Sequence, residues 1–370
     1  MDKQDLKIRD KSIDIGKGIG ILFVLFYHVL YLGSKAFVFE ARVIASVILF
    51  FFIVSGYTYD PGTKSWRQRM AARVKHVLLP TIFCGVLLVI ITGAFLLLRS
   101  GKNPAEFFGL LSADASAAEK LSPDHPSMMF HVIGAYWFPI MLLAADMLFF
   151  AVADHAVKTN LRCSIVCVVL FLISGILIKL FGNGPKGIHG ILVFAGCMLL
   201  GKLLKKLREY IATRISKPIQ WLIVSAALAA YIILVIFFDP GSMARSQFGT
   251  ADSRGIGVLT AVIQGVLFSF VLLFLCDNIS RAGSLSDALT RYGRNSLIIM
   301  LTHCFIAFIL CNLSGVYFHM MSMNALNNGI SIDKPPIVTL QTGAVALLTL
   351  AVTTLLAFCA EKVKKSSHIS

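Results

Sequence analysis

Three ionisable residues interrupt an apolar segment near the start of the chain, DIGKGIGILFVLFYH at residues 14–28. They are an acid (Asp14), a base (Lys17) and an imidazole (His28). The spacing of Lys17 and His28 returns both side chains to one face of a helix, about 16 Å apart along its axis. Ionisable groups inside a membrane cost free energy and usually serve a function. We therefore expect one helix to hold a cation near one membrane surface and a titratable base near the other.

His28 is the candidate catalytic base, because a neutral imidazole with an ordinary pKa of about 6.5 can take a proton from an alcohol. The structural alternative is a core histidine that is hydrogen-bonded to a neighbouring helix. A second intramembrane histidine, His303, lies two turns into an apolar run that Asn295 is positioned to cap. His303 either belongs to the same polar site or bridges two helices.

Lys17 is expected near the cytoplasmic mouth, where its ammonium can hold an anion such as a phosphate of a cytosolic donor. A lysine that extends to the surface from a helix end is the alternative. Asp14 precedes it by one helical turn and can pair with it. Gly16, Gly18 and Gly20 suit either close helix packing or the approach of a ligand.

Four further residues lie in or beside other apolar runs. Ser55 and Gly56 permit close backbone contact in FFIVSGYTY. The sequence contains no G-x-S-x-G elbow, so it does not indicate a serine nucleophile. Trp137 is either an interfacial aromatic anchor or a binding residue. Asp146 is a buried acid that needs a partner, either a histidine or a polar residue such as Gln264.

A basic loop, WRQRMAARVKHVLLP at residues 66–80, is expected before the third apolar run. Most of its cations, including Arg69 and Arg73, would enforce topology at the inner surface. One or two of them can also hold a phosphate-bearing cofactor.

The composition predicts an integral membrane protein. The chain has 370 residues, of which 57% are hydrophobic and 14% charged, and its mean hydropathy is +0.80; a soluble protein carries about 25% charged residues. Apolar runs of about 20 residues can cross a bilayer as helices. We therefore expect an all-α, polytopic membrane bundle of about ten transmembrane helices. The expected spans are 15–32, 42–59, 77–98, 133–153, 161–181, 188–204, 219–238, 256–276, 296–316 and 336–359.

The distribution of positive charge predicts the orientation of these spans. The net charge is +15, and most Lys and Arg residues fall in connectors that face the cytoplasm if the N-terminus is inside. An even number of spans then places the C-terminus inside as well. No basic face with interleaved aromatics is visible, so nucleic-acid binding is not expected.

We expect one integral-membrane domain over residues 1–370, with a cytoplasmic lead at 1–14, the helix bundle at 15–359 and a cytoplasmic tail at 360–370. The eight cysteines lie inside apolar runs without a C-x-x-C pair, which indicates neither a metal site nor a disulfide framework. A cleaved signal peptide is an alternative for residues 1–33. No cleavage site with small residues follows shortly after this apolar run, which favours an uncleaved first helix.

Four segments, in order, resemble the acyltransferase 3 family of membrane O-acyltransferases. DIGKGIGILFVLFYH is similar to the first-helix motif of a basic residue followed by a histidine, and FFIVSGY to the second-helix Phe-x-x-Ser-Gly pattern. The Arg69–Arg73–Pro80 segment resembles the basic stretch that leads into the third helix, and GRNSLIIMLTH the late Asn-Ser-Leu…His motif. Lys17 stands where most members carry arginine, a departure shared with the fucose O-acetylase-like branch. Lysine cannot make the bidentate grip of arginine on phosphate.

The resemblance implies an O-acyltransferase in the bacterial inner (cytoplasmic) membrane, with a cytosolic acyl-CoA donor (acetyl-CoA in the first instance), a glycan or glycolipid acceptor, and no metal. His28 would act on the acceptor hydroxyl. The donor site or its support would contain Lys17, Ser55, Gly56, Arg69, Arg73 and His303. A multi-pass transporter or flippase for a glycan precursor or small anion is the main alternative, although the sequence lacks the internal repeats that such proteins often show.

Overall fold

The computed structural model describes residues 10–29, 34–62, 64–110, 136–181, 188–238, 255–314 and 340–366. These residues form helices and turns, with no strand among them, which confirms the all-α prediction. Each of the ten predicted apolar ranges overlaps one long helix. The long helices are α1 (Lys11–Val29), α2 (Ser34–Tyr57), α4 (Leu79–Ser100), α8 (Trp137–Ala156), α9 (Asn160–Phe181), α10 (Ile188–Arg214), α11 (Lys217–Phe237), α13 (Gly255–Ile279), α15 (Ser296–Ser314) and α17 (Leu340–Ser366).

Six helical segments in the described ranges are long and apolar enough to cross a membrane. The structure therefore supports a multi-pass membrane protein, while the full set of ten spans and the orientation stay predictions. The six are Trp66–Ser100, Trp137–Ala156, Asn160–Leu177, Lys217–Phe237, Val258–Ile279 and Ser296–Ser314. Two shorter apolar stretches, Val43–Tyr57 and Gly343–Cys359, accompany them.

Helices α4, α9 and α11 present large apolar side chains outward. Phe83 and Leu98 on α4 are 69% and 84% exposed, and Leu172 and Leu222 show the same pattern on α9 and α11. Exposure of these apolar side chains to water would cost free energy, whereas contact with lipid hydrocarbon would not. These faces are consistent with contact with lipid.

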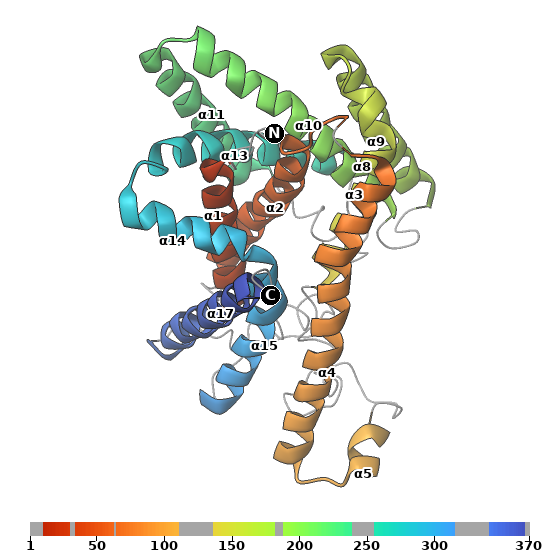
Figure 1. The fold of residues 1–370 in the computed structure, drawn as a ribbon, viewed down its shortest axis with the longest axis vertical. Helices are drawn as coiled ribbons and strands as arrows, with labels where there is room; N and C mark the ends of the chain where they lie inside the picture. Colours follow the sequence, from red (N-terminus) through yellow and green to blue (C-terminus); the bar gives the residue numbers. More distant parts are fainter. Residues whose placement is uncertain are drawn as a thin grey trace.

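Helices α1, α2, α10 and α13 form the centre of the molecule. α1 packs against α2, α13, α15 and the shorter α14 (Gly283–Arg294), and α2 also packs against α10 and α13. Figure 1 shows α14 lying across α1, while α4 extends away from this centre to the short α5 (Pro104–Gly109). The polar residues of interest on α1 are therefore held by neighbours from both halves of the sequence.

The predicted basic loop at 66–80 is helical, so that prediction is wrong. α3 (Trp66–Arg73) begins at Ser65, whose hydroxyl accepts from the Gln68 amide in a capping box, and it continues through a π-helix, η1 (Val74–Leu78), into α4. Pro80 cannot donate in a regular helical ladder, and a π-turn is one way to accommodate such an interruption. Arg69 and Arg73 consequently project from a rigid helix.

Candidate functional site

The start of α1 packs backbone against backbone on α14. A Cβ at Gly18 would lie 2.1 Å from the carbonyl oxygen of Leu289, and one at Gly293 would lie 1.7 Å from that of Asp14. Only glycine permits such an approach at both positions. The first turns of α1 are therefore fixed in place, and the packing alternative accounts for Gly18.

Asp14 is buried at this contact and forms an ion pair with Arg294, with 3.3 Å between Oδ2 and Nε. Its neighbour on the same helix, Lys17, is half-buried. The sequence suggested Lys17 as a partner of Asp14, but it did not indicate Arg294, because that cation lies at the far end of the chain. Lys17 and the Asp14–Arg294 pair therefore lie at the same end of α1.

The other end of α1 carries His28, which meets His303 of α15. The two imidazole rings have centroids 5.2 Å apart, and the Tyr27 ring lies edge-on to His28 at 5.3 Å. His28 is half-buried, whereas His303 has no exposed surface. The structure therefore brings together the two histidines that the sequence identified separately.

The backbone of α15 fixes the orientation of His303. Its Nδ1 lies 3.0 Å from the carbonyl oxygen of Ile299. Because a carbonyl can only accept, Nδ1 carries the hydrogen and donates it, which leaves Nε2 of the neutral ring as an acceptor. Nε2 lies 3.2 Å from Sγ of Cys304, so the thiol can donate to it.

His28, His303 and Cys304 form one cluster, called here the histidine cluster. One nitrogen or sulfur atom from each residue lies within 4.8 Å of the other two. These side-chain types suit general base and nucleophilic chemistry, and they are also types that bind zinc. Cys304 was not predicted as a site residue, although its position directly after His303 is visible in the sequence.

A second cluster joins α2, α3 and α8, and it corrects the expected partner of Asp146. Asp146 has no exposed surface and pairs with Arg73, with 2.9 Å between Oδ2 and Nε. Ser55 Oγ donates to Asp146 at 3.2 Å and accepts from Arg73 Nη2 at 2.8 Å. Among the described residues, neither a histidine nor Gln264 bonds to Asp146, and Gln264 donates to the carbonyl of Leu234 at 2.9 Å.

Gly56 and Arg69 have structural contacts close to this second cluster. A Cβ at Gly56 would lie 1.8 Å from the carbonyl oxygen of Met198, so α2 and α10 are in backbone contact there. Arg69 donates to the carbonyl of Asp60 at 2.7 Å and stacks over the ring of Tyr59 at 4.3 Å. Gly56 therefore holds α2 against α10, and Arg69 holds the turn that follows α2.

The two remaining candidates lie at helix ends. Trp137 begins α8, half-buried, with its ring edge-on to that of Phe138 at 5.9 Å. Asn295 joins α14 to α15, but its side-chain amide donates to the carbonyl of Arg291 at 3.0 Å. That bond closes the end of α14, while the capping role of Asn295 at the start of α15 stays a prediction.

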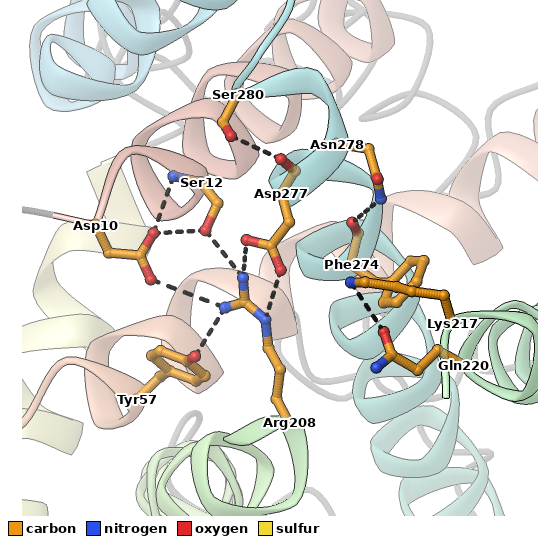
Figure 2. Close-up of polar contacts among 10 residues, drawn as sticks. All are labelled: Asp10, Ser12, Tyr57, Arg208, Lys217, Gln220, Phe274, Asp277, Asn278 and Ser280. Atoms are coloured by element: carbon orange, nitrogen blue, oxygen red, sulfur yellow. Dashed lines mark hydrogen bonds and ion pairs between the residues drawn. The ribbon is translucent and has the colours of Figure 1, made fainter. Parts of the chain in front are cut away.

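A third polar cluster, centred on Arg208 of α10, was not predicted (Figure 2). Its guanidinium contacts Asp277 at the end of α13 and lies 3.8 Å from Asp10. It also donates to the hydroxyl of Tyr57 at 2.7 Å and to that of Ser12 at 3.1 Å. Burial disfavours its charge, yet the hydrogen bond to Asp277 and the nearby acids raise the pKa of Arg208 above its ordinary value. Arg208 therefore ties the ends of four helices together.

Comparison with known families supports the resemblance seen in the motifs. The model of the acyltransferase 3 family, described as an acyltransferase domain, matches residues 10–360. Neither the curated proteins nor the solved structures contain a match to this chain. The match spans all three polar clusters and nearly every helix described above, and the chain therefore belongs to the acyltransferase 3 family of membrane acyltransferases.

Proposed function

We propose that this membrane acyltransferase is an O-acyltransferase that moves an acetyl or similar short acyl group from cytosolic acyl-CoA to a sugar hydroxyl of a cell-surface or exported glycan. The observation that carries the proposal is the histidine cluster, in which His28 and His303 meet between α1 and α15. Ionisable side chains within a membrane bundle usually mark a functional site, and here two imidazoles are in contact. Family membership supplies the acyl chemistry that those protons would serve.

In this proposal, the acceptor hydroxyl gives its proton to His28 as its oxygen attacks the carbonyl carbon of the acyl group. The acyl-CoA phosphates lie toward the end of α1 that carries Lys17, and the thioester extends along that helix toward His28. Arg73 and Arg69 already bond to Asp146 and Asp60, respectively. Their part is therefore to hold α3 in position beside α2 and α8.

The proposed setting is the cytoplasmic membrane of a bacterium, with both chain ends inside. The donor then approaches from the cytoplasm and the glycan or glycolipid from the other side. The six apolar helical segments support residence in a membrane. No metal is needed for direct acyl transfer, because the imidazole supplies the base and the thioester is already activated.

The test uses membranes that contain the full-length protein, supplied with [14C]acetyl-CoA. We expect transfer of label to membrane glycan by the wild type and a loss of about 100-fold or more in His28→Ala, as general base catalysis typically contributes 10²–10⁴-fold. His155→Ala is the matched control, because His155 is an exposed histidine near the end of α8. Full transfer by His28→Ala at equal protein level would refute the role of His28. Mass analysis of surface glycans from a deletion strain would identify the acceptor.

A further inference from the structure

Cys304 is a buried nucleophile that direct transfer does not use. Its side chain is 1% exposed, and its Sγ lies 3.2 Å from Nε2 of His303. The opposite nitrogen of that ring is held by the Ile299 carbonyl. A nucleophile within hydrogen-bond reach of a base that a third group orients is the usual arrangement for covalent catalysis.

Resting on the function proposed above, we propose that Cys304 carries the acyl group as a covalent thioester between donor and acceptor. The geometry assigns one imidazole to each half of the reaction, His303 to the thiol and His28 to the sugar hydroxyl. One nitrogen or sulfur atom of each of the three residues lies within 4.8 Å of the other two, so the acyl group need not move far between the two steps.

In the first step, His303 Nε2 takes the proton of the Cys304 thiol as Sγ attacks the acyl carbon. The bond from that carbon to the CoA sulfur breaks, and the CoA thiolate takes the proton from His303. The products are S-acyl-Cys304 and free CoA. One thioester replaces another, so this step is nearly balanced in free energy and needs no further reactant.

In the second step, His28 takes the proton of the sugar hydroxyl as its oxygen attacks the same carbon. The bond from that carbon to Sγ breaks, and the Cys304 thiolate receives the proton through the adjoining imidazoles. The net change is acyl-CoA plus alcohol to ester plus CoA. His28 is half-buried and is therefore the more accessible of the two rings.

A zinc ion would use the same lone pairs, so it is incompatible with this chemistry. An acyl group on His28 itself is the other covalent alternative. Labelling distinguishes both alternatives from acylation of Cys304. Purified full-length protein is incubated with [14C]acetyl-CoA without acceptor, denatured, and treated with neutral hydroxylamine, which cleaves thioesters, while its zinc content is measured in parallel.

We expect label on the wild type that hydroxylamine removes, and at least as much label on His28→Ala, in which the second step is blocked. Cys304→Ala and Cys304→Ser should carry no hydroxylamine-sensitive label and should transfer at least 100-fold more slowly than the wild type. Cys311→Ala is the matched control, because Cys311 is another buried cysteine of α15 and should keep the label. Equal melting temperatures would show that the variants are folded.

Label that persists in Cys304→Ala, label lost in His28→Ala, or stoichiometric zinc in the active protein would overturn the proposal. Transfer to glycan at the wild-type rate by Cys304→Ala would also overturn it, while leaving the O-acyltransferase function intact. Wild-type membranes that transfer nothing from acetyl-CoA would instead refute the proposed function itself.

Discussion

A buried carboxylate in an apolar bundle costs free energy unless it is paired and hydrogen-bonded, and Asp146 has both kinds of partner. Asp146 pairs with Arg73, and Ser55 bonds to both. Arg73 keeps 32% of its side chain exposed, so it reaches from the surface to the buried carboxylate. The three residues act as one unit that joins α2, α3 and α8.

Removing both charges should destabilise the protein by less than the sum of the two single losses. We expect Arg73→Ala to cost about 2–4 kcal/mol, because it leaves the buried Asp146 carboxylate without its partner. Asp146→Ala should cost less, because the partly exposed Arg73 can extend into water. The double variant should lose less than the sum of the two, by about 1–3 kcal/mol. Thermal unfolding in detergent measures this cycle, with Arg67→Ala as the control on the exposed face of α3. Strictly additive losses would show that the pair does not couple.

The sequence predicted that Asp146 needs a partner, but it could not identify that partner. Arg73 was assigned to a loop, because charge-rich segments between apolar runs are usually connectors. The capping box at Ser65 and the π-turn at Val74–Leu78 instead continue the helix. His28 and His303 were identified individually, yet their contact depends on how α1 and α15 pack. Local patterns do not encode that packing.

Individual helices are held by backbone contacts at glycine and by ion pairs at their ends. Gly56 on α2 meets Met198, and Gly201 on α10 would place a Cβ 2.0 Å from the carbonyl oxygen of Ile53. Contacts of this kind let two helices approach closely in a membrane, where apolar burial between them contributes little. The pairing of α2 with α10 therefore depends on small side chains.

Gly56→Ala should separate α2 from α10 and destabilise the protein. The added methyl group would meet a carbonyl oxygen of the backbone, which cannot rotate away, and overpacking of this kind costs about 1–3 kcal/mol. Gly175→Ala on α9 is the matched control, since no heavy atom lies within 4 Å of its Cβ. That control should be neutral or slightly stabilising, because alanine favours helix. Equal melting temperatures for the two variants would contradict the packing argument.

The Arg208 cluster should stabilise the bundle through α1, α2 and α13 together. We expect Arg208→Ala to cost about 2 kcal/mol, a value typical of hydrogen bonds to charged groups. Lys205→Ala is the control on the same helix, because Lys205 is 4.0 Å from Glu209 in an exposed pair. Unfolding in detergent provides the measurement. A loss in Lys205→Ala as large as that in Arg208→Ala would show that the cluster has no special role.

Across the whole molecule, the polar clusters lie at different levels of the bundle. The Asp14–Arg294 pair is at the start of α1, and the histidine cluster is near its end. α2 runs the opposite way, because Phe50 lies beside Gly16, and Val47 beside Gly20. Ser55, near the end of α2, therefore lies toward the end of the bundle that holds Asp14 and away from the histidine cluster. A donor bound at one level and an acceptor reaching the other would meet along α1.

That arrangement requires the Asp14 end of α1 to face the cytoplasm, which reactive cysteines can test. With the N-terminus inside, the turn after α4 is outside and the turn between α8 and α9 is inside. Lys102 and Lys158 lie in these two turns, and both are exposed. In intact cells, a membrane-impermeant maleimide should label Lys102→Cys at once and Lys158→Cys only after the cells are permeabilised. The wild type gives the background from Cys359, the exposed native cysteine in the described residues. The reverse pattern would place His28 toward the cytoplasm and would exclude the proposed paths of donor and acceptor.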